Sequence, residues 1–186
     1  YDKQLMTSIG DIAASSLHRA ALYDQTELRL RRMTSLRAID AAITASIDTR
    51  VVFNVLLEQV ATQLSVHAAD ILLLNQTTQM LQFSAGRGLV NSISQPNIIP
   101  ISDEILRRVV VERQMVVISE FIKPGNSMTY RRVHSQGFKA YFAVPLIVKG
   151  RVKGVLELFH RAEYKPNAEW LDFLQALALQ TAIAIE

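Results

Sequence analysis

The sequence predicts an α+β domain in which one antiparallel sheet is flanked by helices. Two strand-length apolar runs joined by KGRVKG stand near the end of the chain, within residues 140–160. Helical periodicity appears before and after the strand-rich middle, and the consecutive strands are separated by short turns. Strands joined in this way pair antiparallel. We therefore expect one sheet of five or six strands, with the flanking helices on one of its faces.

The N-terminal part of the chain is predicted to form one long helix. Residues 2–48 contain no proline and a single glycine, and their apolar residues recur at steps of three and four. A continuous helix of this length would measure about 70 Å, which exceeds the width of a single-domain core. Part of it should therefore pack on another chain or lie in solvent. The alternative is one ordinary helix preceded by a disordered tag. The expected stripe comprises Leu5, Ile9, Ile12, Leu30, Met33, Leu36, Ile39, Ile43 and Ile47.

A second helix and a hairpin are expected next. Asp48 or Thr49 can cap the helix, whose apolar positions then recur every fourth residue. After this helix the hydrophobic period changes to that of strands. Residues 69–76 and 80–88 form two strand patterns, and the polar residues 76–79 between them predict an antiparallel hairpin.

The middle of the chain contains shorter elements. After a loop with two prolines, residues 101–114 predict a short helix capped by Ser102 or Asp103. Residues 115–119 predict a short strand. Residues 120–138 are the least regular part of the chain, with room for one or two helical turns.

The closing hairpin divides its side chains between two faces. Strict alternation places Tyr141, Glu157 and Phe159 on one face. The opposite face is more uniformly aliphatic and should lie under the helices. A last helix, capped by Asn167, follows the hairpin, and its large apolar residues fall on one side.

The order of elements and two motifs resemble the GAF domain family. The more specific motif is AVPLIVKGRVKGVLELF followed by the helix EWLDFLQALALQTAIAIE, and the weaker one is FSAGRGL at residues 83–89. The resemblance covers residues 34–186. Members of this family are small-molecule sensory modules of cyclic-nucleotide phosphodiesterases, phytochromes and bacterial signalling proteins. The resemblance implies a PAS-like sheet with a lid over its free face, formed here by residues 119–138, and a ligand between lid and sheet.

The resemblance also gives an interpretation of the first residues. Residues 9–18 are similar to residues 177–186, about one domain length further on. Residues 1–23 thus look like the last helix of a preceding GAF-type domain, and residues 1–33 would form a connector helix before a GAF domain at 34–186. The alternative is a chance similarity between two alanine-rich helices.

Six residues are candidates for the ligand site that the resemblance implies: Phe83, Phe121, Tyr130, Tyr141, Glu157 and Phe159. For each aromatic residue the alternative is core packing. Glu157 stands within an apolar strand, so if buried it must be paired or protonated, whereas an edge position would leave it in solvent. Arg131 and Arg132 are expected on a solvated face, with contact to an anionic ligand as the alternative.

Several family activities are excluded or disfavoured. The chain has no cysteine, so disulfides, thiolate metal sites, a covalently attached bilin and methionine-sulfoxide reduction are excluded. The spaced Asn-Lys, Phe and Asp-Glu pattern of cyclic-nucleotide binders is missing. His67, His134 and His160 are typical of surface or loop histidines, so haem is not expected, and no histidine pair has metal-ligand spacing. The sequence therefore assigns no particular cofactor, and haem or a cyclic nucleotide is not expected.

The function predicted is a non-enzymatic sensory module of a bacterial, cytoplasmic signalling protein. No glycine-rich phosphate loop, no Ser–His–acid or Cys–His arrangement and no paired carboxylates on a shared face are found, and the mixed net charge of +3 gives no support for nucleic-acid binding. No apolar run reaches the ~20 residues of a membrane span. The expected partners are a second copy, through the N- and C-terminal helices, and an output domain such as a histidine kinase, a diguanylate cyclase or an HD-type phosphodiesterase. The alternative is a dimerisation and spacer module with an empty, vestigial pocket.

Overall fold

The chain divides into two units, residues 1–38 and 39–186. The computed structural model describes residues 25, 27, 29–37, 49–89, 98–121 and 127–185. In the first unit, residues 29–37 are helical, and the side chains of Leu30 and Met33 are exposed. The rest of the helix predicted over 2–48 lies almost entirely outside the described residues.

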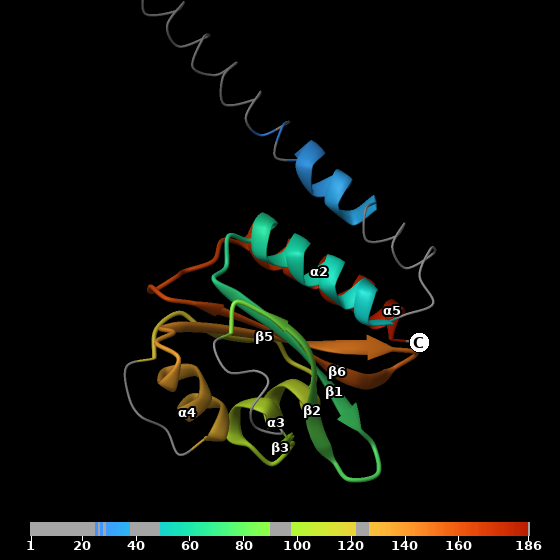
Figure 1. The fold of residues 1–186 in the computed structure, drawn as a ribbon, viewed down its shortest axis with the longest axis vertical. Helices are drawn as coiled ribbons and strands as arrows, with labels where there is room; N and C mark the ends of the chain where they lie inside the picture. Colours follow the sequence, from blue (N-terminus) through green and yellow to red (C-terminus); the bar gives the residue numbers. More distant parts are fainter. Residues whose placement is uncertain are drawn as a thin grey trace, which may run out of the picture. The chain divides into compact units, whose positions relative to one another are not determined.

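The second unit is built on a six-stranded antiparallel sheet, as the sequence predicts (Figure 1). Its strand order is β3-β2-β1-β6-β5-β4, so the closing hairpin and the first strand form the centre. The short edge strand β3 was not predicted, and it contains Pro100, a residue that sheets accept at their edges. The strands are β1 (Ala68–Asn75), β2 (Met80–Arg87), β3 (Ile98–Pro100), β4 (Val116–Ile118), β5 (Ala140–Val148) and β6 (Arg151–His160).

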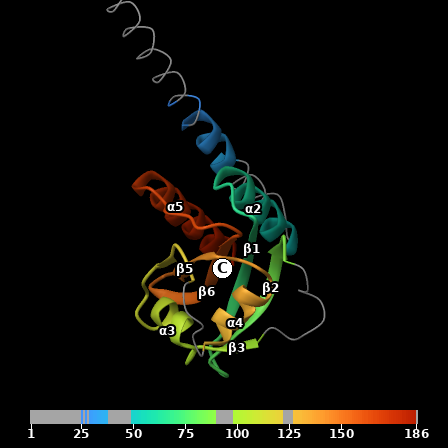
Figure 2. The same ribbon diagram turned by 90° about the vertical axis from the view of Figure 1, so that its left-hand side faces the viewer.

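Helices cover both faces of this sheet (Figures 1 and 2). The helices α2 (Thr49–Gln63) and α5 (Ala168–Ala184) lie together on one face. The shorter helices α3 (Glu104–Val110) and α4 (Met128–Ser135) lie on the other. This arrangement confirms the predicted helical layer on one side and the predicted cover on the other. Of the two caps proposed for α3, Asp103 is the one used.

Local sequence explains the central hairpin. Lys149 and Gly150, which connect β5 to β6, both have positive φ, at 47° and 73°. A two-residue type I′ turn requires this conformation at both positions, and it joins strands with the right-handed twist of a sheet. Asn167 then begins α5, because its Oδ1 accepts a hydrogen bond of 2.8 Å from the backbone N–H of Trp170.

Alternation along the hairpin separates two buried layers. The ring of Phe142 packs against Trp170 of α5, with centroids 4.9 Å apart. Its neighbour Tyr141 points the other way and belongs to a core cluster with Leu106 of α3 and Val133 of α4. The face predicted to carry the candidate ligand residues is thus the face under α3 and α4.

Candidate functional site

Four polar side chains meet on the sheet face beneath α4. Asp70 of β1 and Glu157 of β6 are register partners on adjacent strands, and both are fully buried. Arg132 of α4 donates from Nη1 to Asp70 Oδ2 over 2.8 Å and from Nη2 to Glu157 Oε2. Tyr141 of β5 donates its hydroxyl hydrogen to Glu157 Oε1. One helix and three central strands are therefore joined through a single cluster, which we call the Arg132 cluster.

Burial controls the protonation of this cluster. Burial raises the pKa of Asp70 well above its usual value, the negative charge of Glu157 raises it further, and Arg132 opposes the shift only in part. Burial likewise raises the pKa of Tyr141, followed by the charge of Glu157. Burial alone would lower the pKa of Arg132, but the carboxylates of Glu157 and Asp70 outweigh it and raise that pKa. The cluster therefore keeps the guanidinium of Arg132 ionised and the phenol of Tyr141 neutral, and Asp70 retains its proton to a higher pH than an exposed aspartate does.

Two polar atoms of the Arg132 cluster have no hydrogen-bond partner among the described residues. They are Asp70 Oδ1 and Arg132 Nε, and both are buried. The guanidinium carbon of Arg132 also lies 5.5 Å from the centroid of the Phe159 ring, within the range of a cation–π contact. Buried polar groups are normally paired, so the cluster holds one spare donor and one spare acceptor position.

The structure brings together five of the six predicted ligand residues. The ring centroid of Phe121 lies 5.1 Å from that of Tyr130 and 6.1 Å from that of Tyr141, and Tyr141 lies 5.6 Å from Phe159. Glu157 joins them through the hydroxyl of Tyr141. Phe83 is half-buried against the same core but stands on β2, which β1 separates from β6. Their role in ligand binding stays a prediction.

Three sequence interpretations need correction here. Arg132 was expected on a solvated face, yet only 12% of its side chain is exposed and it forms two ion pairs. Arg131 is exposed, as expected. Glu157 is fully buried, so the alternative of an edge position is wrong. Asp70 was not identified from the sequence, although it interrupts an apolar strand in the same way as Glu157, and the expectation that no carboxylates are paired on a shared face is therefore wrong.

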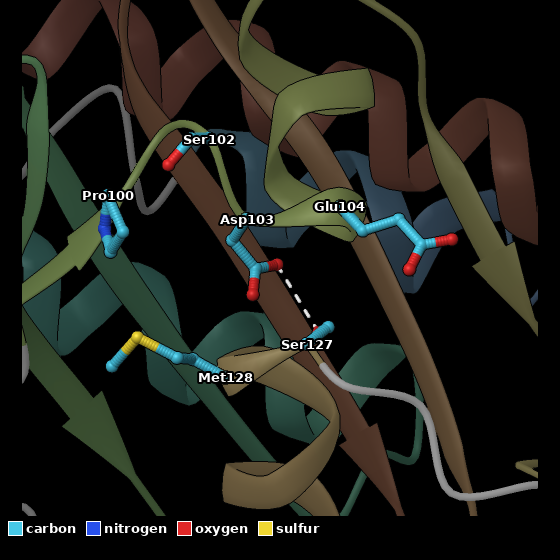
Figure 3. Close-up of a pocket in the computed structure, with 6 residues that line it drawn as sticks. All are labelled: Pro100, Ser102, Asp103, Glu104, Ser127 and Met128. Carbon is cyan, nitrogen blue, oxygen red and sulfur yellow. Dashed lines mark hydrogen bonds between the residues drawn. The ribbon is translucent and has the colours of Figure 1, made fainter.

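A cavity of about 240 Å³ lies where α3 and α4 begin (Figure 3). Asp103 caps α3 and reaches α4 as well: its Oδ1 accepts from the hydroxyls of Ser127 and Thr129, at 3.3 and 3.0 Å. None of the six predicted ligand residues lines this cavity. The carboxylate of Asp103 thus joins the beginnings of the two covering helices. The lining residues are Pro100, Ser102, Asp103, Glu104, Ser127 and Met128.

The three histidines considered for haem take no part in the hydrogen bonds that the structure describes for the Arg132 cluster. His67 and His160 pack edge to face, with ring centroids 4.3 Å apart, and burial together with the charge of His160 lowers the pKa of His67. His134 is exposed on α4 and stacks on Tyr130. Within the described ranges, no group of three or more side chains is arranged to hold a metal ion.

Comparison with known proteins identifies the family. A family model described as GAF domain matches residues 46–186, so the chain belongs to the GAF domain family. GAF domains commonly act in sensing and signalling and are generally regulatory. No curated protein matches the chain significantly. In the part of the chain that the structure describes, no helix is long and apolar enough to cross a membrane.

Solved structures share the fold at low sequence identity. The GAF domain of a phosphoenolpyruvate-protein phosphotransferase from Acinetobacter has a TM-score of 0.68 and 21% identity, over 83% of this chain and 92% of that chain. Residues 122 to 287 of a methyl-accepting chemotaxis protein have a TM-score of 0.66 and 22% identity, over 79% of this chain and 94% of that chain. A free methionine-R-sulfoxide reductase from Neisseria meningitidis, solved with its substrate, has a TM-score of 0.69 and 15% identity, over 86% of this chain and 90% of that chain. The fold is therefore shared with domains of a phosphotransferase and a chemotaxis protein and with a methionine-sulfoxide reductase.

Proposed function

We propose that this domain is a non-catalytic sensory module of a multidomain bacterial signalling protein. It binds a small molecule between the sheet and α4, and it passes the bound state through dimeric helices to an output domain. The observation that supports this proposal most is the Arg132 cluster, because it connects the covering helix α4 to strands β1, β5 and β6 at once.

The reverse face of the same strands provides a route for relay. Tyr141 faces the Arg132 cluster, while the next residue, Phe142, contacts Trp170 of α5. A ligand that changes the partners of Arg132 would therefore shift a strand whose other side supports a terminal helix. Differential binding of a few kcal/mol is sufficient to move such a two-state equilibrium.

The chemistry of the cluster supports regulation rather than catalysis. Both carboxylates are engaged by Arg132, and the raised pKa of Tyr141 keeps its phenol protonated. A general base or nucleophile needs a free electron pair that is directed at a reacting atom. Neither Glu157 nor Tyr141 offers one while the ion pairs are intact.

A metabolite screen tests ligand binding. We expect at least one small metabolite to raise the melting temperature of the protein, by roughly 5–10 °C at a hundredfold excess over its Kd. The shift should be lost in Glu157→Gln, because this variant removes a charge at the centre of the Arg132 cluster. Asp172→Asn, exposed on α5, is the matched control and should respond like the unmodified protein. Absence of any shift across the screen would contradict ligand binding.

A spacer module is the second candidate function. Tyr141 and Phe159 are fully buried in a core cluster, so the chain's own side chains fill this part of the sheet face. A domain that only joins and dimerises helices needs no more than that. Dimerisation that persists without any ligand effect in the screen would favour the spacer.

Dimerisation has its own test. Leu179 and Ile183 lie one turn apart on α5, with 59% and 53% of their surfaces exposed. Replacing both by glutamate should convert dimers to monomers in sedimentation experiments while the melting temperature of the core changes little, because charges would then face each other across the contact. Thr62→Glu, exposed on α2, is the control. The pair Met33→Asp and Leu36→Asp tests the connector helix in the same way. Unchanged sedimentation of all variants would exclude a dimer through these helices.

A further inference from the structure

We propose that the carboxylate pair Asp70–Glu157 is a cation-binding site that Arg132 fills in the closed domain and for which a small guanidinium or amine ligand competes. This inference rests on the proposed sensory function and names the chemical class of its ligand. Arg132 would then act as an internal substitute for the ligand, and displacement of its side chain would release α4 from the sheet.

The way in which Arg132 is held supports recognition of the guanidinium group itself. Its two terminal nitrogens donate to two different carboxylates, one on β1 and one on β6. A free alkylguanidinium presents the same planar pair of donors. The two carboxylates belong to the sheet, whereas the guanidinium belongs to a short helix that covers it. Removal of Arg132 would therefore leave the carboxylates in place.

The charge balance of the site selects cations. Two buried carboxylates face one guanidinium, and burial beside Glu157 raises the pKa of Asp70. A cationic ligand that takes the place of Arg132 would keep this charge balance. An anionic ligand would instead meet two like charges with little water to screen them, so the anion that the Arg131–Arg132 pair suggests in the sequence does not suit this site.

Arg132 leaves part of the site unused. Asp70 Oδ1 is buried and has no hydrogen-bond partner in the described part of the chain, and Arg132 Nε is in the same condition. A ligand that approaches without the constraint of a helix backbone could place a donor on Asp70 Oδ1. It would keep the contact with the Phe159 ring, over which the Arg132 guanidinium now lies. The additional hydrogen bond to Asp70 would enable a small cation to compete with a tethered side chain.

Chemical rescue of Arg132→Ala tests the site directly. Millimolar methylguanidinium or agmatine should raise the melting temperature of this variant by roughly 5 °C, because binding to the folded state alone stabilises it. Methylurea, which has a similar shape but no charge, and tetramethylammonium, which has no N–H donor, should give no shift beyond that of sodium chloride at equal ionic strength.

Two control variants separate the site from general effects. Arg131→Ala, exposed on the same helix, should respond to methylguanidinium no more than the unmodified protein does, because Arg132 still occupies the carboxylates. The double variant Arg132→Ala/Glu157→Gln should lose the rescue, because it removes half of the carboxylate pair. Equal responses of Arg132→Ala and Arg131→Ala, or no response of either, would overturn the proposal.

The unmodified protein provides a second measurement, which does not depend on the folding of Arg132→Ala. Agmatine should accelerate amide hydrogen exchange in α4, at Val133 for example, and leave the middle of α5 unchanged. Unchanged exchange in α4 at saturating agmatine would overturn the proposal. If the metabolite screen identifies an acidic or neutral ligand whose effect depends on Glu157, the cation inference fails and the sensory function stands. If no ligand of any class is found, the sensory function itself fails.

Discussion

Replacing Arg132 by leucine is expected to destabilise the domain by about 3–5 kcal/mol at neutral pH, because the two buried carboxylates of the Arg132 cluster lose the guanidinium that pairs with them. Asp70 and Glu157 are fully buried, and Arg132 forms an ion pair with each. Without Arg132 each carboxylate must be protonated or remain charged in a medium of low dielectric constant. Since domains of this size have a free energy of unfolding of about 5–15 kcal/mol, the loss would be a large share of the total.

The loss should depend on pH, with a sign that follows from Asp70. Burial raises the pKa of Asp70 in the folded protein above its usual 3.8, so over the interval above pH 3.8 the native state binds a proton that the unfolded state has released. Stability contributed by this group is complete at lower pH and falls as the pH rises through the interval. Arg132 opposes the shift. Arg132→Leu should therefore raise the pKa of Asp70 further. The free energy of unfolding that this variant loses should be greater at neutral pH than in acid.

Urea unfolding at several pH values measures this prediction. The free energy of unfolding of Arg132→Leu should approach that of the unmodified protein as the pH is lowered, whereas Asp70→Asn should reduce the pH dependence. Arg131→Leu, on the same helix and exposed, should stay within about 0.5 kcal/mol of the unmodified protein. A similar loss in both arginine variants, or a loss that is independent of pH, would show that the ion pairs contribute little.

The contrast between Arg131 and Arg132 shows what the sequence could not reveal. The two residues are adjacent and chemically identical, and only the phase of α4 turns one towards the sheet. The partners of Arg132 stand 62 and 25 positions away in the chain, so no local pattern connects them. Such a contact depends on the register of β1 against β6, which the sequence pattern did not specify.

Local signals, by comparison, predicted the central hairpin and its two faces correctly. Strict alternation separates Tyr141 from Phe142, and a lysine–glycine pair supplies the turn. Edge strand β3 was missed because three residues ending in a proline give almost no strand signal. Asp70 could have been found by the reasoning that identified Glu157, since each is a carboxylate within an apolar strand. That signal identifies a buried polar cluster, but it does not name the ligand.

Gly154→Ala is expected to have an effect as large as that of Arg132→Leu, for a reason of backbone geometry. Gly154 lies in β6 and pairs with Leu73 of β1 on one side and Leu146 of β5 on the other. A Cβ at this position would stand 2.3 Å from the carbonyl oxygen of Leu72. This oxygen belongs to the backbone of the neighbouring central strand, so relief requires β1 and β6 to separate. We expect a loss of more than about 4 kcal/mol, which is exceptional for a single substitution.

Gly150→Ala in the same hairpin is the matched control. Gly150 has a positive φ of 73°, but a Cβ there would have no atom within 4 Å. Its cost is therefore limited to the strain of the left-handed conformation, about 1–2 kcal/mol. Urea unfolding of both variants separates backbone strain from steric overlap, because the same chemical change is made in a turn and within a strand that is paired on both sides. A loss in Gly154→Ala no greater than that in Gly150→Ala would contradict the close approach of β1 and β6 in the structure. It would then also contradict the close pairing of Asp70 and Glu157, which lie on these two strands.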